Sequence, residues 1–155
     1  VCLKKNSASD RENDASTEKK VSAGLREMSM ELPVPGILES PFGVFESKIF
    51  SYKKQKIEEK KYTKWFDYDK IKNSPCVRTR RQGDYLTVNS EGGRKKLNRI
   101  FIDEKIPAEM RDRLPVVAVG SEILWIPGGR MNEKYKITST TGRVLELHYQ
   151  GGALA

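Results

Sequence analysis

The stretch "EGGRKKLNRIFIDEKIPAEMRDRLP", residues 91–115, places two glycines, three consecutive cations and an amphipathic segment in one run. On a helical wheel of about 3.6 residues per turn, Leu97, Ile100 and Phe101 share one stripe, and the cations lie opposite it. The pattern predicts a helix that begins at residues 94–96. A helix start prefers acidic residues, because its unpaired N–H groups already make that end positive. Three cations at this place therefore raise the question of a negatively charged partner.

A second, shorter helix is expected directly after the first one. Pro107 ends the first helix and suits the first position of the next, where its missing N–H costs nothing. The second segment, "PAEMRDRL" (107–114), ends at Pro115, and Met110 and Leu114 share its inner face. Both helices are therefore expected to pack on a core.

Short strands are expected on both sides of the helices, because apolar runs and alternating residues stand there between turn signals. The strands before the helices are "ELPVPGIL" (31–38), "FGVFESKIFSY" (42–52), "KKYTKWFDY" (60–68) and "PCVRTRR" (75–81). After the helices, two hairpins are predicted, formed by "VVAVG" (116–120) with "ILWI" (123–126), and by "KYKITST" (134–140) with "RVLELHY" (143–149). The sum is an α+β fold of mostly antiparallel short strands packed around two central helices.

Composition divides the chain into three parts. Residues 1–30 are polar and poor in large apolar side chains, so we expect a linker or insertion without fixed structure. Residues 31–149 carry the strands and helices of one domain, and residues 150–155 are expected to be a tail. The chain begins at Val1 rather than at a methionine, and we therefore expect a piece of a longer protein.

Positive charge is concentrated in one part of the sequence. The 155 residues contain 29 Lys+Arg and 21 Asp+Glu, a formal net charge of +8. Residues 76–99 alone contain seven cations and two anions. A local excess of this kind is compatible with a polyanionic partner such as nucleic acid. The alternative is an ordinary solvated surface.

The glycine pair Gly92–Gly93 with the cations after it is the first candidate site. Glycine lets the backbone approach a ligand closely, and a helix start presents unpaired N–H groups to an anion. Gly93 and the cations Arg94, Lys95 and Lys96 would then bind a phosphate group. The alternative is a cationic turn that binds nothing. The spacing of a Walker-type nucleotide-binding loop is absent.

The second candidate site is the cluster Arg78, Arg80 and Arg81 before the turn "QGD" (82–84). Arginines on one face of a strand can fork onto successive phosphates. The alternative is that Arg80 or Arg81 pairs with Asp84 and braces the turn.

No catalytic or metal-binding pattern is evident in the sequence. Cys2, Cys76 and the single His148 do not supply the ligands of a zinc site, and no nucleophile elbow is present. A disulfide between Cys2 and Cys76 is the alternative, but Cys2 lies in a polar tail, so we expect both thiols to be free, which is typical of a reducing compartment such as the cytoplasm. No apolar run approaches the roughly 20 residues of a membrane span, and no signal peptide is visible.

Four segments, taken in order, resemble one known family. They are "FDYDKI" (66–71), "VRTRRQGDYL" (77–86), "GGRKKLNRIFIDEKIPAEMRDRLPVV" (92–117) and "EILWIPGGRM" (122–131). No single segment is specific, but the ordered set is similar to the C-terminal domain of bacterial tRNA(Ile)-lysidine synthetases. The similarity covers about residues 31–149.

The resemblance implies a part of a tRNA-modifying ligase. Enzymes of that family use ATP to adenylate the wobble cytidine of tRNA(Ile), and lysine then displaces AMP to form lysidine. ATP and magnesium are expected in their N-terminal catalytic domain, which carries a Ser-Gly-Gly-x-Asp-Ser loop. That loop is absent here, so we expect no catalytic residue, metal or cofactor in this chain and no activity of the chain alone.

The resemblance also implies the partners and the residues that contact them. The family's C-terminal domain helps to hold tRNA(Ile) at its acceptor stem, beside the enzyme's own N-terminal domain. The matching candidates for phosphate contacts are Arg80, Arg81, Arg94, Lys95, Lys96 and Arg99, with Lys105 and Arg111 as contacts or structural braces. The rival hypothesis is a structural module that positions the catalytic domain without contacting RNA. A homodimer is a further assembly that we consider, and no membrane is expected.

Overall fold

The computed structural model describes residues 29–58 and 60–151. Most of the expected linker, residues 1–30, lies outside these ranges, but Ser29 and Met30 belong to strand β1 (Ser29–Glu31). At the other end, Gln150 and Gly151 are not a tail, because they continue strand β10 (Arg143–Gly151). Both ends of the domain thus extend slightly beyond the predicted limits.

Four strands form the first sheet, and all of its neighbours are antiparallel. Across the sheet they are β2 (Gly36–Ser40), β3 (Gly43–Ser51), β10 and β4 (Thr63–Asp67). β3 and β10 pair along nine residues each, from Gly43 opposite Gly151 to Ser51 opposite Arg143. Their buried positions alternate with exposed ones near the start of β3, as expected when one face of a sheet covers a core.

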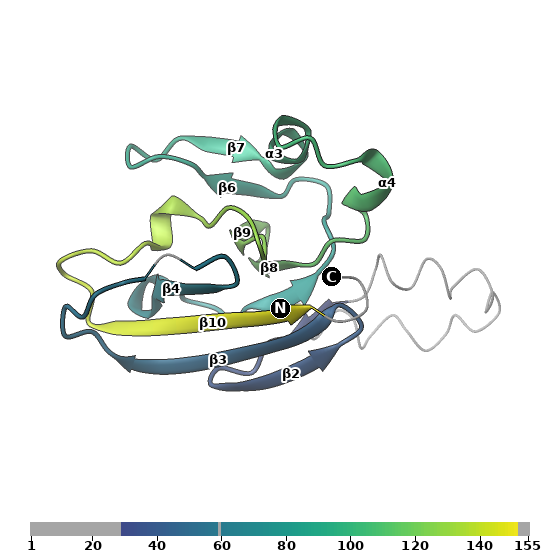
Figure 1. The fold of residues 1–155 in the computed structure, drawn as a ribbon. Helices are drawn as coiled ribbons and strands as arrows, with labels where there is room; N and C mark the ends of the chain where they lie inside the picture. Colours follow the sequence, from purple (N-terminus) through teal and green to yellow (C-terminus); the bar gives the residue numbers. More distant parts are fainter. Residues whose placement is uncertain (1–28, 59, 152–155) are drawn as a thin grey trace.

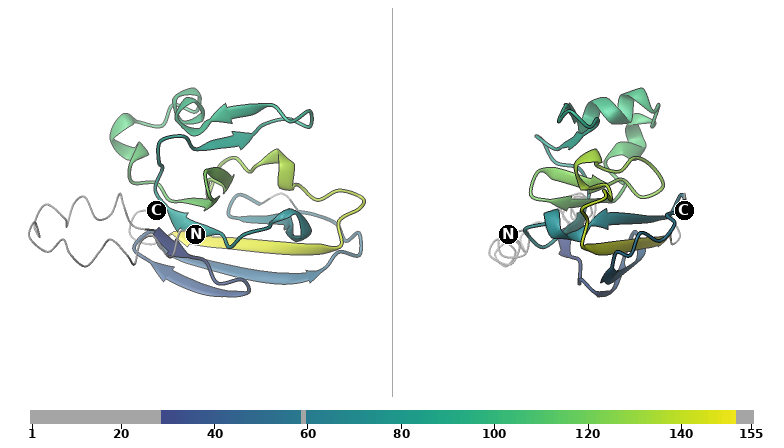
Figure 2. Two further views of the ribbon diagram at one scale, coloured as in Figure 1. Left: turned by 180° about the vertical axis from the view of Figure 1, so that it is seen from behind. Right: turned by 90° about the vertical axis from the view of Figure 1, so that its left-hand side faces the viewer.

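Six shorter strands form the second sheet. In order they are β1, β5 (Cys76–Arg78), β8 (Val116–Val119), β9 (Glu122–Trp125), β6 (Tyr85–Thr87) and β7 (Arg94–Lys96). One pair, β6 with β9, is parallel, and the other neighbours are antiparallel. Figures 1 and 2 show β5, β8 and β9 beside the four-stranded sheet, with β6 and β7 at the far end of the molecule.

Two apolar clusters hold these layers together. The first lies between the sheets and includes Phe45, Phe66, Trp125 and Leu145, with the rings of Phe66 and Trp125 6.3 Å apart. The second joins the far end of the six-stranded sheet to a helix and includes Leu86, Leu97, Ile100 and Phe101, among others. The domain is therefore a strand-dominated α+β fold.

The helices are not central, which corrects the prediction. α3 (Leu97–Asp103) buries Leu97, Ile100 and Phe101, as the apolar stripe predicted, but it has only seven residues. α4 (Ala108–Arg111) buries no residue. Both lie at the end of the molecule that carries β7, away from the four-stranded sheet (Figure 1).

The last predicted hairpin is also wrong. Residues 134–140 form no strand; instead a short 3-10 helix, η3 (Glu133–Tyr135), follows its cap residue Asn132. Tyr135 is buried and donates its hydroxyl hydrogen to Glu122, which fixes this segment against β9. β10 pairs instead with β3 and β4, which are distant in sequence. A second 3-10 helix, η2 (Tyr68–Lys70), follows β4.

Three further observations concern the cysteine, membrane spans and metal binding. Cys76 is disulfide-bonded, so the expectation of a free thiol is wrong at this position. Within the described ranges, no helix is long and apolar enough to cross a bilayer. The same ranges contain no cluster of three or more His, Cys, Asp or Glu side chains that could hold a metal ion.

Candidate nucleic-acid interface

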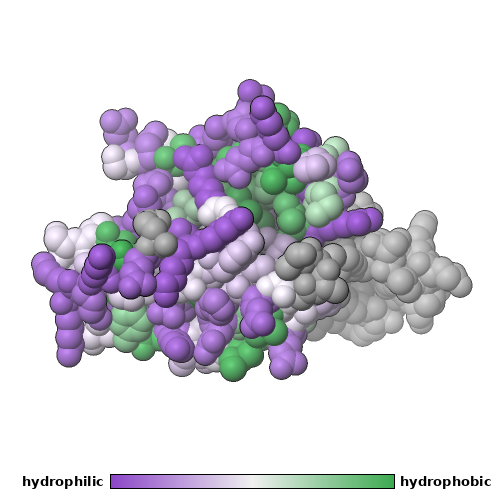
Figure 3. Space-filling model, in the orientation of Figure 1, coloured by the Kyte–Doolittle hydropathy of each residue, from purple (hydrophilic) through white to green (hydrophobic). Residues whose placement is uncertain are grey.

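The three consecutive cations form an edge strand and not a helix start. In β7, residues 94–96 pair antiparallel with β6, so that Arg94 lies opposite Thr87 and Lys96 opposite Tyr85. α3 begins only at Leu97, because Lys96 keeps an extended conformation (φ −69°, ψ 143°). The cations therefore line one edge of the six-stranded sheet. Hydrophilic side chains cover much of this end of the molecule (Figure 3).

The glycine pair serves the turn between β6 and β7. The Asn89 side-chain oxygen accepts hydrogen bonds from the N–H groups of Glu91 and Gly93, at 3.0 and 2.9 Å. A Cβ on Gly93 would lie 2.7 Å from the Asn89 side chain, and Gly92 has a φ of +89°. The turn thus requires both glycines, and the N–H of Gly93 is already paired within it.

At the start of α3, one backbone N–H group is already paired. The N–H of Leu97 donates to the carbonyl oxygen of Asp84 at 2.9 Å. No side chain caps the helix, and its first turn contains no acidic residue. The three cations thus belong to an edge strand that precedes the helix, and phosphate binding by this segment stays a prediction.

Arg78 lies in the interior and forms a two-pronged ion pair with Asp84. Its two terminal nitrogens each lie 2.9 Å from a carboxylate oxygen, and they also donate to the carbonyl oxygens of Thr79 and Gly120. The side chains of Arg78 and Asp84 are 3% and 1% exposed. The bracing pair foreseen for Arg80 or Arg81 is thus made by Arg78, which is left out of the proposed RNA contacts.

Arg80 connects the two helical segments. Its Nε donates to the carboxylate of Asp112 at 2.8 Å, and Nη1 donates to the side-chain oxygen of Asn98, also at 2.8 Å. Asn98 lies in α3 and Asp112 directly follows α4. Arg80 is partly exposed, so a ligand can contact only the part of its guanidinium that does not face Asp112 and Asn98.

Arg81 differs from its neighbours because no hydrogen bond or ion pair of its guanidinium is found within residues 29–58 and 60–151. Its backbone N–H donates to Asp84 Oδ2 at 2.7 Å. Burial, and then the positive charge of Arg78, lower the pKa of the Arg81 guanidinium, while Asp84 acts in the opposite direction. An arginine still remains charged at neutral pH. Arg81 is therefore a partly buried cation without a carboxylate of its own.

Lys95 and Arg99 share the carboxylate of Asp103. Lys95 Nζ lies 2.5 Å from Asp103 Oδ2, and Arg99 Nε lies 3.4 Å from Oδ1. The hydrogen bond from Lys95 and the charges of both cations lower the pKa of Asp103, and desolvation opposes them only in part. Arg99 remains well exposed, so the group still presents positive charge to solvent.

Arg94 and Lys96 project from the β7 edge and are exposed. The guanidinium carbon of Arg94 lies 4.6 Å from the centre of the Tyr85 ring, a cation–π arrangement that orients the planar group. Lys96 makes no ion pair with any described residue. These two side chains form the most accessible part of the predicted site.

The two remaining candidates lie around the connection between the helices. Lys105 is exposed and has a positive φ of 59°, at the chain reversal after α3. Arg111 is partly buried, and its Nε donates to the carbonyl oxygen of Ile106 at 2.9 Å. Lys105 thus remains available to a ligand, whereas Arg111 braces the connection.

Sequence reasoning missed the residues that organise these cations. Asn98, Asp103 and Asp112 fix the side chains of Arg80, Lys95 and Arg99, and Tyr85 orients Arg94. Of these contacts, only the pair of Arg99 and Asp103 was predictable from the sequence, because residues four apart on a helix lie side by side. We define the cationic edge as the exposed or partly exposed side chains of Arg80, Arg81, Arg94, Lys95, Lys96, Arg99 and Lys105.

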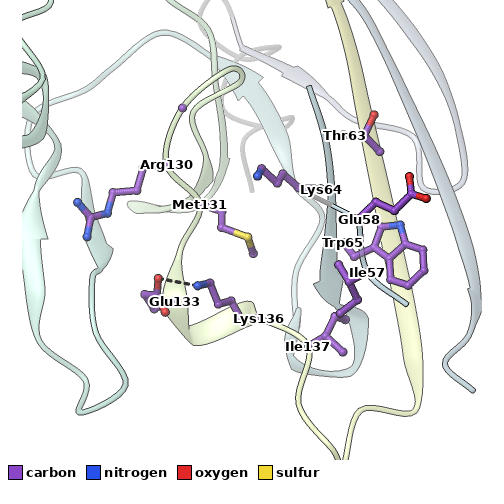
Figure 4. A pocket seen from close by; sticks show the side chains of 11 residues that line it. Ile57, Glu58, Thr63, Lys64, Trp65, Arg130, Met131, Glu133, Lys136 and Ile137 are labelled. Carbon is purple, nitrogen blue, oxygen red and sulfur yellow. Dashed lines mark ion pairs between the residues drawn. The ribbon is translucent and has the colours of Figure 1, made fainter. Parts of the chain in front are cut away.

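A cavity of about 370 Å³ lies elsewhere, between β4 and the segment 129–137 (Figure 4). Trp65 and Met131 line it, and a 3.0 Å ion pair joins Glu133 to Lys136 at its wall. Figure 4 shows Arg130 directed away from this space, and its Nη2 donates to Val88 at 3.5 Å. Because carboxylates and cations are mixed here, this cavity lacks the consistent charge of the cationic edge.

Comparison with known proteins gives a consistent result. The model of the family "TilS substrate C-terminal domain" matches residues 76–147. A tRNA(Ile)-lysidine synthase of Caldanaerobacter subterraneus is 50% identical over 88 residues, 57% of this chain and 19% of the relative. One of Clostridium tetani is 41% identical over 90 residues, 58% of this chain and 19% of the relative. The chain therefore spans about a fifth of the length of these curated relatives.

A solved structure extends the similarity to the fold. The crystal structure of a TilS C-terminal domain superposes with a TM-score of 0.68 at 33% sequence identity. The match covers 80% of this chain and 96% of the solved one. Because the similarity spans nearly the whole of that domain, the chain belongs to the family of TilS C-terminal domains, whose sequence relatives are tRNA(Ile)-lysidine synthases.

Proposed function

We propose that this chain is the tRNA-binding part of a tRNA(Ile)-lysidine synthase and that its cationic edge contacts the phosphates of the tRNA acceptor stem. The observation that carries the proposal is the exposed pair Arg94 and Lys96 on an edge strand, together with Arg81, whose guanidinium has no ion pair with a described residue. Phosphate contacts position an RNA without reading its sequence, so base recognition is left to other parts of the enzyme.

The proposal places the chemistry outside this chain. The parent enzyme would use ATP and magnesium in its N-terminal domain to adenylate the wobble cytidine of tRNA(Ile) before lysine attacks. This chain would hold and orient the tRNA, and the chain alone is expected to be inactive. The cytoplasm, where tRNA is modified and used, is the compartment that fits this role.

Binding of a tRNA(Ile) transcript across a salt series tests the proposal. Each phosphate neutralised by a cation releases condensed counterions, so log K should fall linearly with log salt, by about 0.7–0.9 per phosphate. Lys96→Glu should weaken binding and reduce this slope. Lys48→Glu is the matched control, because Lys48 is an exposed lysine on β3 of the other sheet. A flat response of the unaltered chain to salt would contradict the phosphate contacts.

A second candidate function is a structural module that packs on the catalytic domain without contacting RNA. It is favoured by the ion pairs of Arg80, Lys95 and Arg99 with Asp112 and Asp103, which use part of the positive charge internally. Charge reversal of Lys95 and Lys96 in the complete synthase separates the two functions. Unchanged activity on tRNA would favour the structural module, and a raised KM for tRNA would favour the RNA contact.

A further inference from the structure

We propose that Arg81 is the phosphate anchor of the cationic edge and that Asp84, through its buried pair with Arg78, is the residue that positions it. The inference rests on the proposed RNA-binding function and assigns separate roles to residues that the sequence pattern treats alike. Three observations carry it: the charge balance around Asp84, the geometry of the turn, and the partial burial of Arg81.

Of the three arginines beside Asp84, only Arg81 has a guanidinium without an ion pair to a described residue. Both oxygens of Asp84 accept hydrogen bonds from the Arg78 guanidinium at 2.9 Å, and Oδ2 also accepts the backbone N–H of Arg81. The carboxylate is thus used by three donors, none of which is the Arg81 side chain. The other nearby arginine, Arg80, has its own carboxylate in Asp112. The Asp84 carboxylate is therefore occupied by the Arg78 guanidinium, and within residues 29–58 and 60–151 the guanidinium of Arg81 has no ion pair, so its charge can be met by an external anion.

The turn geometry fixes where that charge lies. Asp84 closes the turn twice, because its side chain accepts the N–H of Arg81 and its N–H donates to the Arg81 carbonyl oxygen at 3.2 Å. The Asp84 carbonyl oxygen in turn accepts the N–H of Leu97. Arg78 completes the arrangement by donating to the carbonyl oxygen of Gly120 at 2.8 Å. One buried ion pair thus ties the backbone of Arg81 to the junction of β7 and α3, where Lys96 lies.

Partial burial makes Arg81 a better anchor than a fully solvated lysine. Its guanidinium is already partly desolvated beside the charge of Arg78, which is the cause of its lowered pKa. A phosphate that approaches it removes little additional water from the cation and can accept two parallel hydrogen bonds from the guanidinium. A solvated cation on a flexible stem lacks both advantages.

The anchor is tested with an unmodified tRNA(Ile) transcript and the 155-residue chain, by measuring Kd over a salt series. Arg81→Gln should weaken binding about tenfold near 0.1 M salt and reduce the slope by about 0.7–0.9, the value of one phosphate. Arg143→Gln is the matched control: Arg143 is an exposed arginine of β10, in an ion pair with Asp69. If Arg81→Gln and Arg143→Gln give the same slope, Arg81 is not the anchor.

The positioning role is tested with Asp84→Asn, which makes the chain one charge more positive. If net charge alone governed binding, this variant would bind tRNA more tightly. Positioning predicts the opposite, a several-fold weaker binding. Circular dichroism and a thermal melt show whether Asp84→Asn is folded at the assay temperature. Where it is not, the double variant Arg78→Met/Asp84→Leu replaces the pair at unchanged net charge, and apolar replacements of buried pairs commonly preserve a fold.

The outcomes are distinguishable. Weakened binding of Asp84→Asn or of the double variant supports the positioning role, and binding equal to or tighter than the unaltered chain overturns it. If the unaltered chain fails to bind tRNA at every salt concentration, the proposed function itself fails and the anchor fails with it. If the unaltered chain binds and Arg81→Gln does not differ from it, only the anchor is overturned.

Discussion

Two ion-paired aspartates show how differently the same chemistry acts inside and outside this domain. Asp84 and its partner Arg78 are almost completely buried, with side chains 1% and 3% exposed. Asp103 and its partner Arg99 are 37% and 65% exposed. Water screens the outer pair and leaves its cations available, whereas the inner pair is shielded from water and hydrogen-bonds to the backbone of Thr79, Gly120 and Arg81. Exposure, and not the type of residue, separates the scaffold from the candidate RNA surface.

The largest expected effect is on the inner pair. Asp84→Ala leaves the Arg78 charge buried without a counterion, and removal of one partner of a buried pair destabilises by about 3–5 kcal/mol. Asp103→Ala removes the outer carboxylate, and because solvent screens an exposed pair, the loss of stability should be much smaller. Urea unfolding of the two variants measures both. Similar losses of stability would show that burial does not distinguish the two aspartates.

A smaller effect is expected in the turn that presents the outer cations. Gly93→Ala places a Cβ 2.7 Å from the Asn89 side chain, which must then give up its hydrogen bond to the N–H of residue 93. We expect a destabilisation of about 1 kcal/mol, the usual contribution of one hydrogen bond, measured by urea unfolding. Gly129→Ala is the matched control, because its nearest neighbour would be 3.4 Å away. Equal effects at the two glycines would contradict the role of the Asn89 turn.

The smallest effect is a dependence on acid. Lys95, with Arg99, lowers the pKa of Asp103 below its ordinary value of 3.8, so the folded form holds the ionised carboxylate more strongly than the unfolded form does. The stabilisation is therefore fully present above pH 3.8 and is lost as the pH falls through the lowered pKa. The difference in unfolding free energy between the unaltered chain and Asp103→Asn should be constant near neutrality and vanish in stronger acid. A difference that grows as the pH falls would contradict this assignment.

Sequence patterns predicted those elements in which the spacing of apolar residues matches the buried face in the fold. The stripe of Leu97, Ile100 and Phe101 identified the buried face of α3, because an apolar stripe has few alternatives once a helix forms. The cations of β7 carried no such signal. Their strand has three residues and exists because the turn at Asn89 brings them back along β6.

The sequence predicted which cations belong to the candidate site, but not which residues they pair with. The pattern placed Arg78 among the arginines of a phosphate-binding strand face, yet all three residues of β5 are buried: Val77 belongs to the core between the sheets, and Arg78 is enclosed with Asp84. The partners of Arg80 were equally hidden, since Asn98 and Asp112 are 18 and 32 residues away in sequence. Contacts over such sequence separations depend on the whole fold, so no periodic pattern in the sequence indicates them.

The position of β7 at the edge of its sheet has a consequence for self-association. An edge strand offers unpaired backbone groups to any extended chain, and such edges are a common starting point for aggregation. A second copy that docked in this way would bring its own Arg94 and Lys96 against the same charges. Repulsion between the two copies is therefore expected to disfavour sheet extension at this edge in the absence of a polyanion.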